Sequence, residues 1–132
     1  MKLFRIIIPV GDINDAERFY SALLGTKGER VSAGRHYFNL DGMIVACYDA
    51  KADGDDPQPR WMPHENQYLY FAVPDLEKTF ETVKKLNAQR IDRRIEKMPW
   101  GERLFYLRDP WGNPLCMVDE STVFLGGETK SH

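Results

Sequence analysis

Hydrophobic and polar positions at the start of the chain follow two different periods. Residues 3–10 form an apolar run that ends before Asp12, which predicts a buried strand. Apolar residues then recur every three or four positions over 13–24 and stop at Gly25, as in an amphipathic helix that ends at a glycine. Asp12 or Asn14 can cap this helix by accepting hydrogen bonds from free backbone N–H groups.

The same pattern occurs a second time. Residues 68–73 form another strand-like run, and a helical pattern with one apolar face follows over 76–86. Val10 and Asp12 reappear as Val73 and Asp75, at a constant offset of 63 residues. This internal repeat predicts two modules of about 65 residues with the same order of elements.

Hairpin patterns follow each predicted helix. In the first half, strands over 36–40 and 43–48 flank Asp41-Gly42, a strong two-residue turn signal. In the second half, strands over 104–108 and 114–118 flank a turn at 109–112, and shorter strands over 28–31 and 90–95 complete each copy. The order is βαβββ, twice. A ferredoxin-like sandwich is the alternative, but the paired hairpins favour an eight-stranded arrangement.

Length and composition are those of one ordinary domain of 132 residues. We expect module one over about 1–50, a linker rich in Asp, Gly and Pro over 51–63, module two over 64–121 and a tail over 122–132. A net charge of −2 argues against a nucleic-acid partner, which would require clustered Lys and Arg.

Cysteine use and apolar runs bear on the compartment. Cys47 and Cys116 lie far apart, so the chain does not resemble a secreted disulfide scaffold. The apolar run over 6–8 is too short for a signal peptide or a membrane span. We therefore expect a cytoplasmic protein with no membrane partner.

The segment from Trp100 to Asn113, WGERLFYLRDPWGN, resembles the signature W-G-x-R-x-x-x-x-x-D-P-x-G-N/H of the vicinal oxygen chelate superfamily, which includes glyoxalases, bleomycin-resistance proteins and extradiol dioxygenases. The first module, with Pro9-Val10-Gly11-Asp12, then Phe-Tyr and Leu-Gly, is similar to the family's opening. The resemblance covers nearly the whole chain and implies an α+β fold. In it, two βαβββ modules form a curled eight-stranded mixed sheet around a cavity, with helices outside. It also implies a homodimer.

Enzymatic members of that family bind one divalent metal through His, Gln or Glu side chains. The matching positions here are Arg5, Ala46, Tyr68 and Cys116. An arginine repels a cation, and a tyrosine ligates poorly near neutral pH. His36 and His64 fall outside these positions, so we expect no metal and no other cofactor, with a divalent metal as the alternative.

The resemblance implies that Arg5, Tyr68 and Cys116, at the ligand positions, face the cavity, and alternation along the strand adds Tyr70 to that face. A guanidinium can bind a carboxylate and phenols supply stacking area, so we expect an anionic or aromatic ligand. Trp61 and Trp100 are further candidates for the cavity wall, although Trp100 could equally pack as a structural residue.

Four functions remain open from the sequence. The first is a metal-free protein of the glyoxalase/bleomycin-resistance type that binds a small aromatic or anionic molecule. The second is a metal-dependent lyase, isomerase, thiol transferase or dioxygenase of the same superfamily. The third is a metal-free enzyme that uses Tyr68, Arg5 or Cys116. The fourth is a partner-binding module with a vestigial cavity. The ligand positions favour the first.

Overall fold

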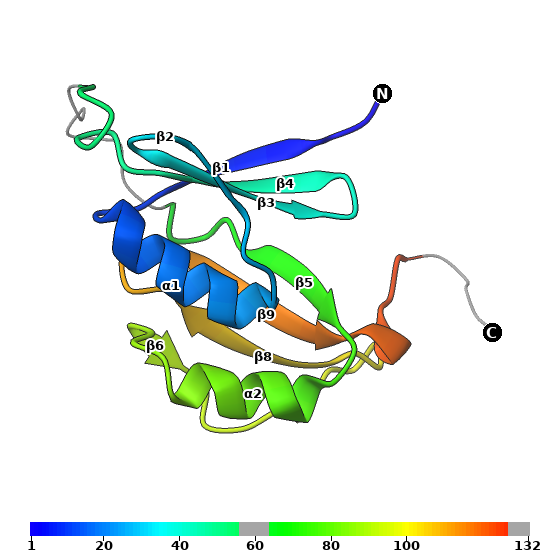
Figure 1. The fold of residues 1–132 in the computed structure, drawn as a ribbon. Coiled ribbons are helices and arrows are strands. Elements are labelled where there is room, and N and C mark those ends of the chain that lie inside the picture. The colour runs from blue at the N-terminus through cyan, green and yellow to red at the C-terminus, as the bar shows by residue number, and fades with distance from the viewer. Residues whose placement is uncertain (56–63, 127–132) are drawn as a thin grey trace. The chain divides into compact units, whose positions relative to one another are not determined.

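The computed structural model describes residues 1–55 and 64–126 (Figure 1). The chain divides into two compact units, Met1–His64 and Glu65–His132, each built from one long helix and one mixed sheet. Trp61 and most of the expected tail lie outside the described residues. Within the described chain, neither helix has the length or apolar character needed to cross a bilayer.

The first unit follows the predicted order of elements. It comprises β1 (Arg5–Pro9), α1 (Ile13–Leu24), β2 (Glu29–Ser32), β3 (Arg35–Leu40) and β4 (Met43–Tyr48). The sheet order is β1-β4-β3-β2, with β1 parallel to β4 and the other pairs antiparallel. Helix α1 packs on one face of this sheet, where Tyr20 contacts Phe38 with ring centroids 6.2 Å apart.

Local signals explain where these elements begin and end. The Asp12 carboxylate accepts a 3.0 Å hydrogen bond from the Asp15 N–H, so Asp12 is the N-cap. Gly25 ends α1 in the left-handed region at φ 70°. Between β3 and β4, Asp41 and Gly42 both have positive φ, as a tight two-residue hairpin requires.

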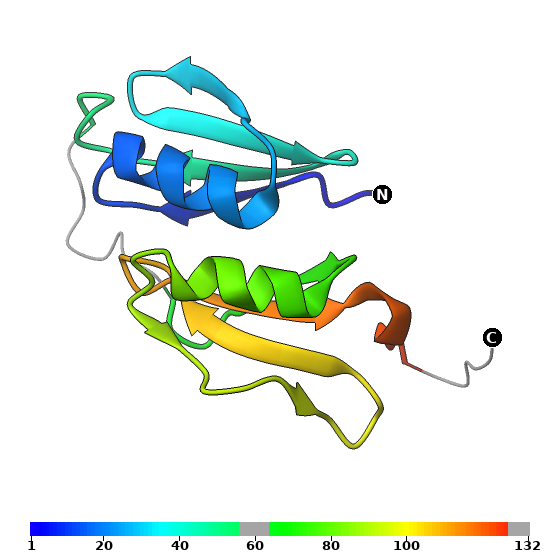
Figure 2. The ribbon, with the colours of Figure 1, turned by 60° about the horizontal axis from the view of Figure 1, so that its bottom comes forward.

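The second unit repeats the first with one extra strand. It comprises β5 (Leu69–Val73), α2 (Leu76–Lys84), β6 (Arg90–Ile91), β7 (Glu96–Lys97), β8 (Arg103–Arg108), β9 (Pro114–Asp119) and a 3-10 turn (Glu120–Thr122). The sheet order is β5-β9-β8-β6, and β7 also pairs with β8. Helix α2 runs alongside β8 and β9 (Figures 1 and 2), and Phe80 packs edge-to-face on Phe105.

The strand expected over 90–95 is shorter than predicted, because β6 ends at Ile91 and the next strand, β7, begins only at Glu96. The Asp92 backbone N–H donates to the Tyr106 carbonyl at 3.0 Å. The Tyr106 N–H donates to the Asp92 carboxylate, also at 3.0 Å. A side chain thus takes the place of a backbone acceptor, and the strand pairing stops there.

The turn between β8 and β9 is organised by a buried carboxylate. Asp109 is fully buried and accepts hydrogen bonds from the N–H groups of Trp111 and Asn113 at 2.9 and 2.8 Å. It also accepts from the Asn113 side-chain amide at 2.6 Å. These bonds fix the hairpin register, which pairs Arg108 with Pro114.

The predicted α+β class is confirmed, with a mixed sheet in each unit and a helix packed on one face of it. In each unit the helix-covered face supplies the aromatic core. The other face of the second sheet carries a cluster of polar and aromatic side chains, and this cluster forms the candidate site.

Candidate functional site

Strand register brings residues from four segments of the second unit onto one face. On β9, Cys116 pairs with Tyr70 of β5 on one side and with Tyr106 of β8 on the other. Two residues further along β8, Arg108 pairs with Arg90 of β6. Because paired residues and alternate positions share a face, these side chains all leave the sheet away from α2.

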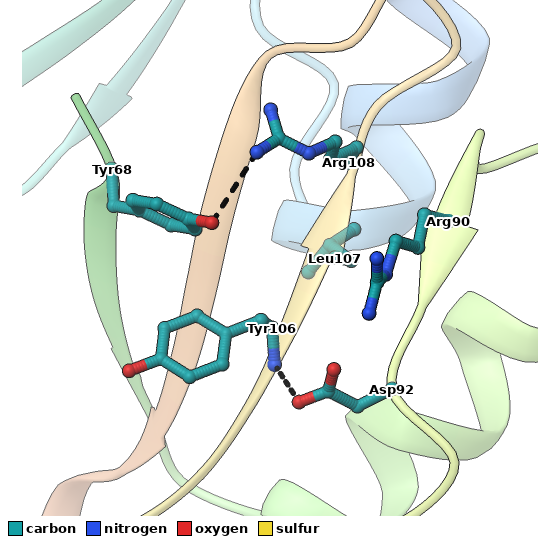
Figure 3. A pocket seen from close by; sticks show the side chains of 6 residues that line it. All are labelled: Tyr68, Arg90, Asp92, Tyr106, Leu107 and Arg108. Atoms are coloured by element: carbon teal, nitrogen blue, oxygen red, sulfur yellow. Dashed lines mark hydrogen bonds between the residues drawn. The ribbon is translucent and has the colours of Figure 1, made fainter. Parts of the chain in front are cut away.

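This face contains a pocket of about 170 Å³ (Figure 3). Six residues from β6, β8 and the segments beside them line it: Tyr68, Arg90, Asp92, Tyr106, Leu107 and Arg108. The pocket therefore combines two phenol rings, two guanidinium groups and one carboxylate. An engineered cavity of about 150 Å³ in another protein holds one benzene ring, so this pocket suits a ligand built on a single ring.

The aromatic wall is made by perpendicular rings. Tyr68 and Tyr106 pack edge-to-face with centroids 5.3 Å apart, and Tyr70 and Tyr106 do so at 6.5 Å. The Tyr106 hydroxyl lies 3.5 Å from that of Tyr70. This hydrogen bond, followed by burial, raises the pKa of Tyr106 above its usual value of 10.0. Tyr106 is consequently a neutral phenol at physiological pH.

Arg108 is held by neutral partners. Its guanidinium donates to the backbone carbonyls of Gly112 and Glu65, at 3.1 and 3.2 Å. It also donates to the Tyr68 hydroxyl at 3.4 Å and lies 5.7 Å from the centre of that ring. These contacts fix where the group points without neutralising its charge.

Arg90 and Asp92 complete the polar side of the pocket. Within the described part of the chain, the Arg90 guanidinium forms no hydrogen bond or ion pair, although Arg108 lies directly across from it. One Asp92 oxygen, Oδ2, accepts from the Tyr106 N–H. The other, Oδ1, has no partner among the described residues. The pocket thus offers an excess of positive charge and one open acceptor.

The residues expected in the cavity of the second half divide into two groups. Tyr68 lines the pocket, and Tyr70 lies beside it with 56% of its surface exposed. Cys116 has the expected orientation but is fully buried, because Tyr106 and Met98 pack over its cluster. Burial raises the pKa of the Cys116 thiol to about 12, with the nearby Glu102 and Asp92 carboxylates adding to the shift. The structure therefore does not bring this thiol to the pocket surface.

The other expected site residues do not line this pocket. Arg5 lies on the first sheet, with its guanidinium over the rings of Phe4 and Tyr37 at 5.2 and 5.6 Å. Trp100 is half exposed, and its indole N–H donates to the Glu102 carboxylate at 2.8 Å. Trp61 falls outside the described residues.

The family's metal-ligand positions do not fit a divalent cation. Arg5 cannot donate an electron pair, and Ala46 has no ligating atom. Tyr68 presents a phenol, and a phenol is a poor ligand for a divalent cation near neutral pH. Cys116 presents a buried thiol whose raised pKa disfavours the thiolate that a metal binds. Elsewhere in the described chain, no three His, Cys, Asp or Glu side chains are grouped to hold a metal.

Two polar residues outside the pocket, His36 and Arg103, have structural roles. His36 is buried on the helix-covered face, where its ring nitrogens contact the Lys27 carbonyl at 2.9 Å and Arg30 at 3.2 Å. Arg103 bridges Asp119, at 2.7 Å, and Glu77 of α2. Neither residue is available to a ligand in the pocket.

Sequence reasoning missed five pocket residues: Arg90, Asp92, Tyr106, Leu107 and Arg108. The hairpin pairing could have indicated Tyr106, since it lies opposite Cys116, and Arg108 follows from the alternation along β8. Arg90 and Asp92 had no comparable signal, because their placement depends on how β6 pairs with β8.

Comparisons with known proteins agree with this architecture. The "Uncharacterized protein YwbC" of Bacillus subtilis is 28% identical over 115 residues, which cover 80% of this chain and 86% of that protein. Among solved structures, a glyoxalase-related enzyme from Fulvimarina pelagi superposes with a TM-score of 0.74 at 16% identity, covering 98% of this chain and 96% of that one.

A glyoxalase/bleomycin resistance protein from Albidiferax ferrireducens T118 superposes with a TM-score of 0.72 at 20% identity, covering 87% of this chain and 95% of that one. These two structural likenesses establish the fold. The model of the Glyoxalase/Bleomycin resistance protein/Dioxygenase superfamily matches residues 2–117, which is most of the sequence. The chain therefore belongs to the Glyoxalase/Bleomycin resistance protein/Dioxygenase superfamily.

Proposed function

We propose that this protein binds a small aromatic anion without a metal, in the pocket of the second unit. The observation that carries the proposal is the composition of the pocket wall. The Tyr68 and Tyr106 rings stand next to Arg90 and Arg108, and neither guanidinium forms an ion pair within the described chain. Phenol rings supply stacking area, and a guanidinium recognises carboxylates.

The chemistry of the lining favours binding over covalent catalysis. The Cys116 thiol is buried and has a raised pKa, and the pKa of Tyr106 is also raised, so both groups stay protonated near neutral pH. Asp92 already accepts a hydrogen bond from the backbone. The residues at the family's metal positions supply no set of imidazole and carboxylate ligands.

Titration with charge-matched probes tests the proposal. Benzoate, benzamide and benzylamine have the same ring but are anionic, neutral and cationic. Two-dimensional NMR of the backbone amides measures millimolar affinities and locates binding through the Tyr106 and Arg108 signals. We expect benzoate to bind there, more tightly than benzamide, and benzylamine not to bind. Equal binding of the three probes, or no binding by any, would overturn the proposal.

A matched pair of variants links binding to the pocket. Arg108→Gln removes a charge that faces the ring of Tyr68, and Arg18→Gln removes an exposed charge on α1 in the first unit. We expect Arg108→Gln to weaken the binding of benzoate about tenfold, as loss of a charge-assisted hydrogen bond predicts. Arg18→Gln should leave the affinity unchanged.

Metal analysis tests the metal-free part of the proposal. We expect protein purified without chelators to contain well under one equivalent of Zn, Mn, Fe or Ni. Stoichiometric metal that activates the protein as a lyase, thiol transferase or dioxygenase would favour the metal-dependent alternative. The homodimer and the cytoplasmic location remain predictions, and light scattering of the purified protein measures the first.

A further inference from the structure

The two arginines of the pocket form an unusual pair. Arg90 on β6 lies directly opposite Arg108 on β8, and both side chains line the pocket. Like charges that face each other across two strands destabilise a sheet. A sheet that keeps such a pair, with no carboxylate paired to either guanidinium in the described chain, is suited to an oxyanion placed between them.

Arg90 and Arg108 have different roles in this pair. Arg108 is oriented by Gly112, Glu65 and Tyr68, so its position is set before a ligand arrives. The exposed Arg90 guanidinium has no partner among the described residues, and Figure 3 shows it extending into the pocket beside Asp92. One fixed and one adjustable guanidinium can together hold both oxygens of a carboxylate.

Asp92 adds a second requirement for the ligand, a hydrogen-bond donor, which a simple anion does not have. Its Oδ2 is occupied by the Tyr106 N–H at 3.0 Å, and this bond fixes the carboxylate at the pocket wall. Its Oδ1 accepts no hydrogen bond from the described residues, and both oxygens appear in Figure 3 at the lower edge of the pocket. A carboxylate repels a second anion but accepts a hydrogen bond from a hydroxyl or amino group.

We propose that the ligand is a single-ring compound with an oxyanion at one position and a hydrogen-bond donor at another. The oxyanion lies between Arg90 and Arg108, the ring lies on Tyr68 and Tyr106, and the donor bonds to Asp92 Oδ1. Hydroxybenzoates and aminobenzoates are members of this class. This inference rests on the proposed function and names the ligand class for the same pocket.

The test compares ligands that can donate a hydrogen bond with similar ligands that can only accept one. The probes are benzoate, 3- and 4-hydroxybenzoate, and the two corresponding methoxybenzoates, which cannot donate. Affinities come from the same NMR titration, in buffer of low ionic strength because salt screens an exposed anion site. We expect at least one hydroxybenzoate to bind about tenfold more tightly than its methoxy counterpart.

Asp92→Asn then reverses the polarity of one contact. The asparagine oxygen can still accept from the Tyr106 N–H, and its amide nitrogen turns a donor towards the ligand. The preference for hydroxy over methoxy should disappear or invert, while benzoate binds at least as tightly as before. If the preference survives in Asp92→Asn, or if the wild-type protein shows none, the inference fails even where benzoate binding upholds the proposed function.

Arg90→Gln tests the arginine pair. We expect it to weaken all five probes about tenfold and to leave the melting temperature unchanged or higher, because a like-charge contact is removed. Arg94→Gln is the control, since it removes an exposed arginine of the same segment whose partner is Glu96. If Arg90→Gln and Arg94→Gln bind the probes with equal affinity, the proposed position of the oxyanion between Arg90 and Arg108 is wrong. Failure of every benzoate to bind the wild-type protein would instead overturn the proposed function itself.

Discussion

The buried carboxylate of Asp109 gives the sharpest test of how this fold is held together. Asp109→Ala removes the acceptor for the Trp111 and Asn113 N–H groups and for the Asn113 amide. The site is closed to solvent, since Asp109 is fully buried and Asn113 is 6% exposed. Water therefore cannot replace the lost acceptor without local opening of the hairpin.

The magnitude follows from these three bonds. A hydrogen bond to a charged group contributes about 1.5–3 kcal/mol to stability, and part of this is offset because a buried carboxylate also costs desolvation. We expect Asp109→Ala to lower the free energy of unfolding by about 3 kcal/mol. For a chain of this length, that corresponds to a fall in melting temperature of roughly 10 °C.

Urea denaturation followed by circular dichroism measures the effect, and two further variants isolate its cause. In Asp109→Asn the remaining oxygen can accept from the backbone, and the Asn113 amide can rotate to present its own oxygen, so we expect a smaller loss of about 1 kcal/mol. Asp41→Asn changes the exposed carboxylate of the hairpin turn in the first unit and should shift stability by less than about 0.5 kcal/mol. An Asp109→Ala protein as stable as Asp41→Asn would refute the view that this carboxylate organises the turn.

Three further predictions concern the cysteines, the acid response and one glycine. Both cysteines are buried and burial raises the pKa of Cys116, so iodoacetamide at pH 8 should label neither until denaturant is added; rapid labelling of the native protein would contradict this. A hydrogen bond from the Ser32 hydroxyl lowers the pKa of Asp53 below its usual 3.8, so the contribution of Asp53 to stability is complete above that pH and is lost as pH falls through the lowered value. Acid titrations should therefore show a weaker pH dependence in Ser32→Ala than in the wild type. A Cβ on Gly34 would collide with the Asp49 carbonyl, so Gly34→Ala should cost about 2 kcal/mol or more in urea denaturation, and a neutral result would show that this loop yields.

Sequence patterns predicted the elements that depend on near neighbours. The repeat at an offset of 63 residues located both long helices, and Asp12 and Asp75 cap them as the second copy of the pattern suggested. Such features follow from contacts within a turn of helix or along one strand, which is why the sequence alone reveals them.

Features that depend on distant partners were not predictable in the same way. The strand expected over 90–95 breaks because Asp92 bonds to Tyr106, which lies 14 residues later in the chain. Arg90 and Arg108 face each other only because of the register in which β6 pairs with β8. Cys116 had its expected orientation, but the side chains that cover it come from other segments. The sequence therefore indicated a face of the sheet without indicating the pocket on it.

The segment from 100 to 113 shows why the family can be recognised when the ligand cannot. The residues that the signature specifies build the hairpin: Asp109 and Asn113 close its turn, and Arg103 ties it to Asp119. Tyr106 and Arg108 occupy positions that the signature leaves open, and both line the pocket. A match to this signature therefore indicates that the hairpin can fold, because a buried turn tolerates few side chains. Under the proposed function, the residues that select the ligand lie at these open positions, which the signature does not constrain.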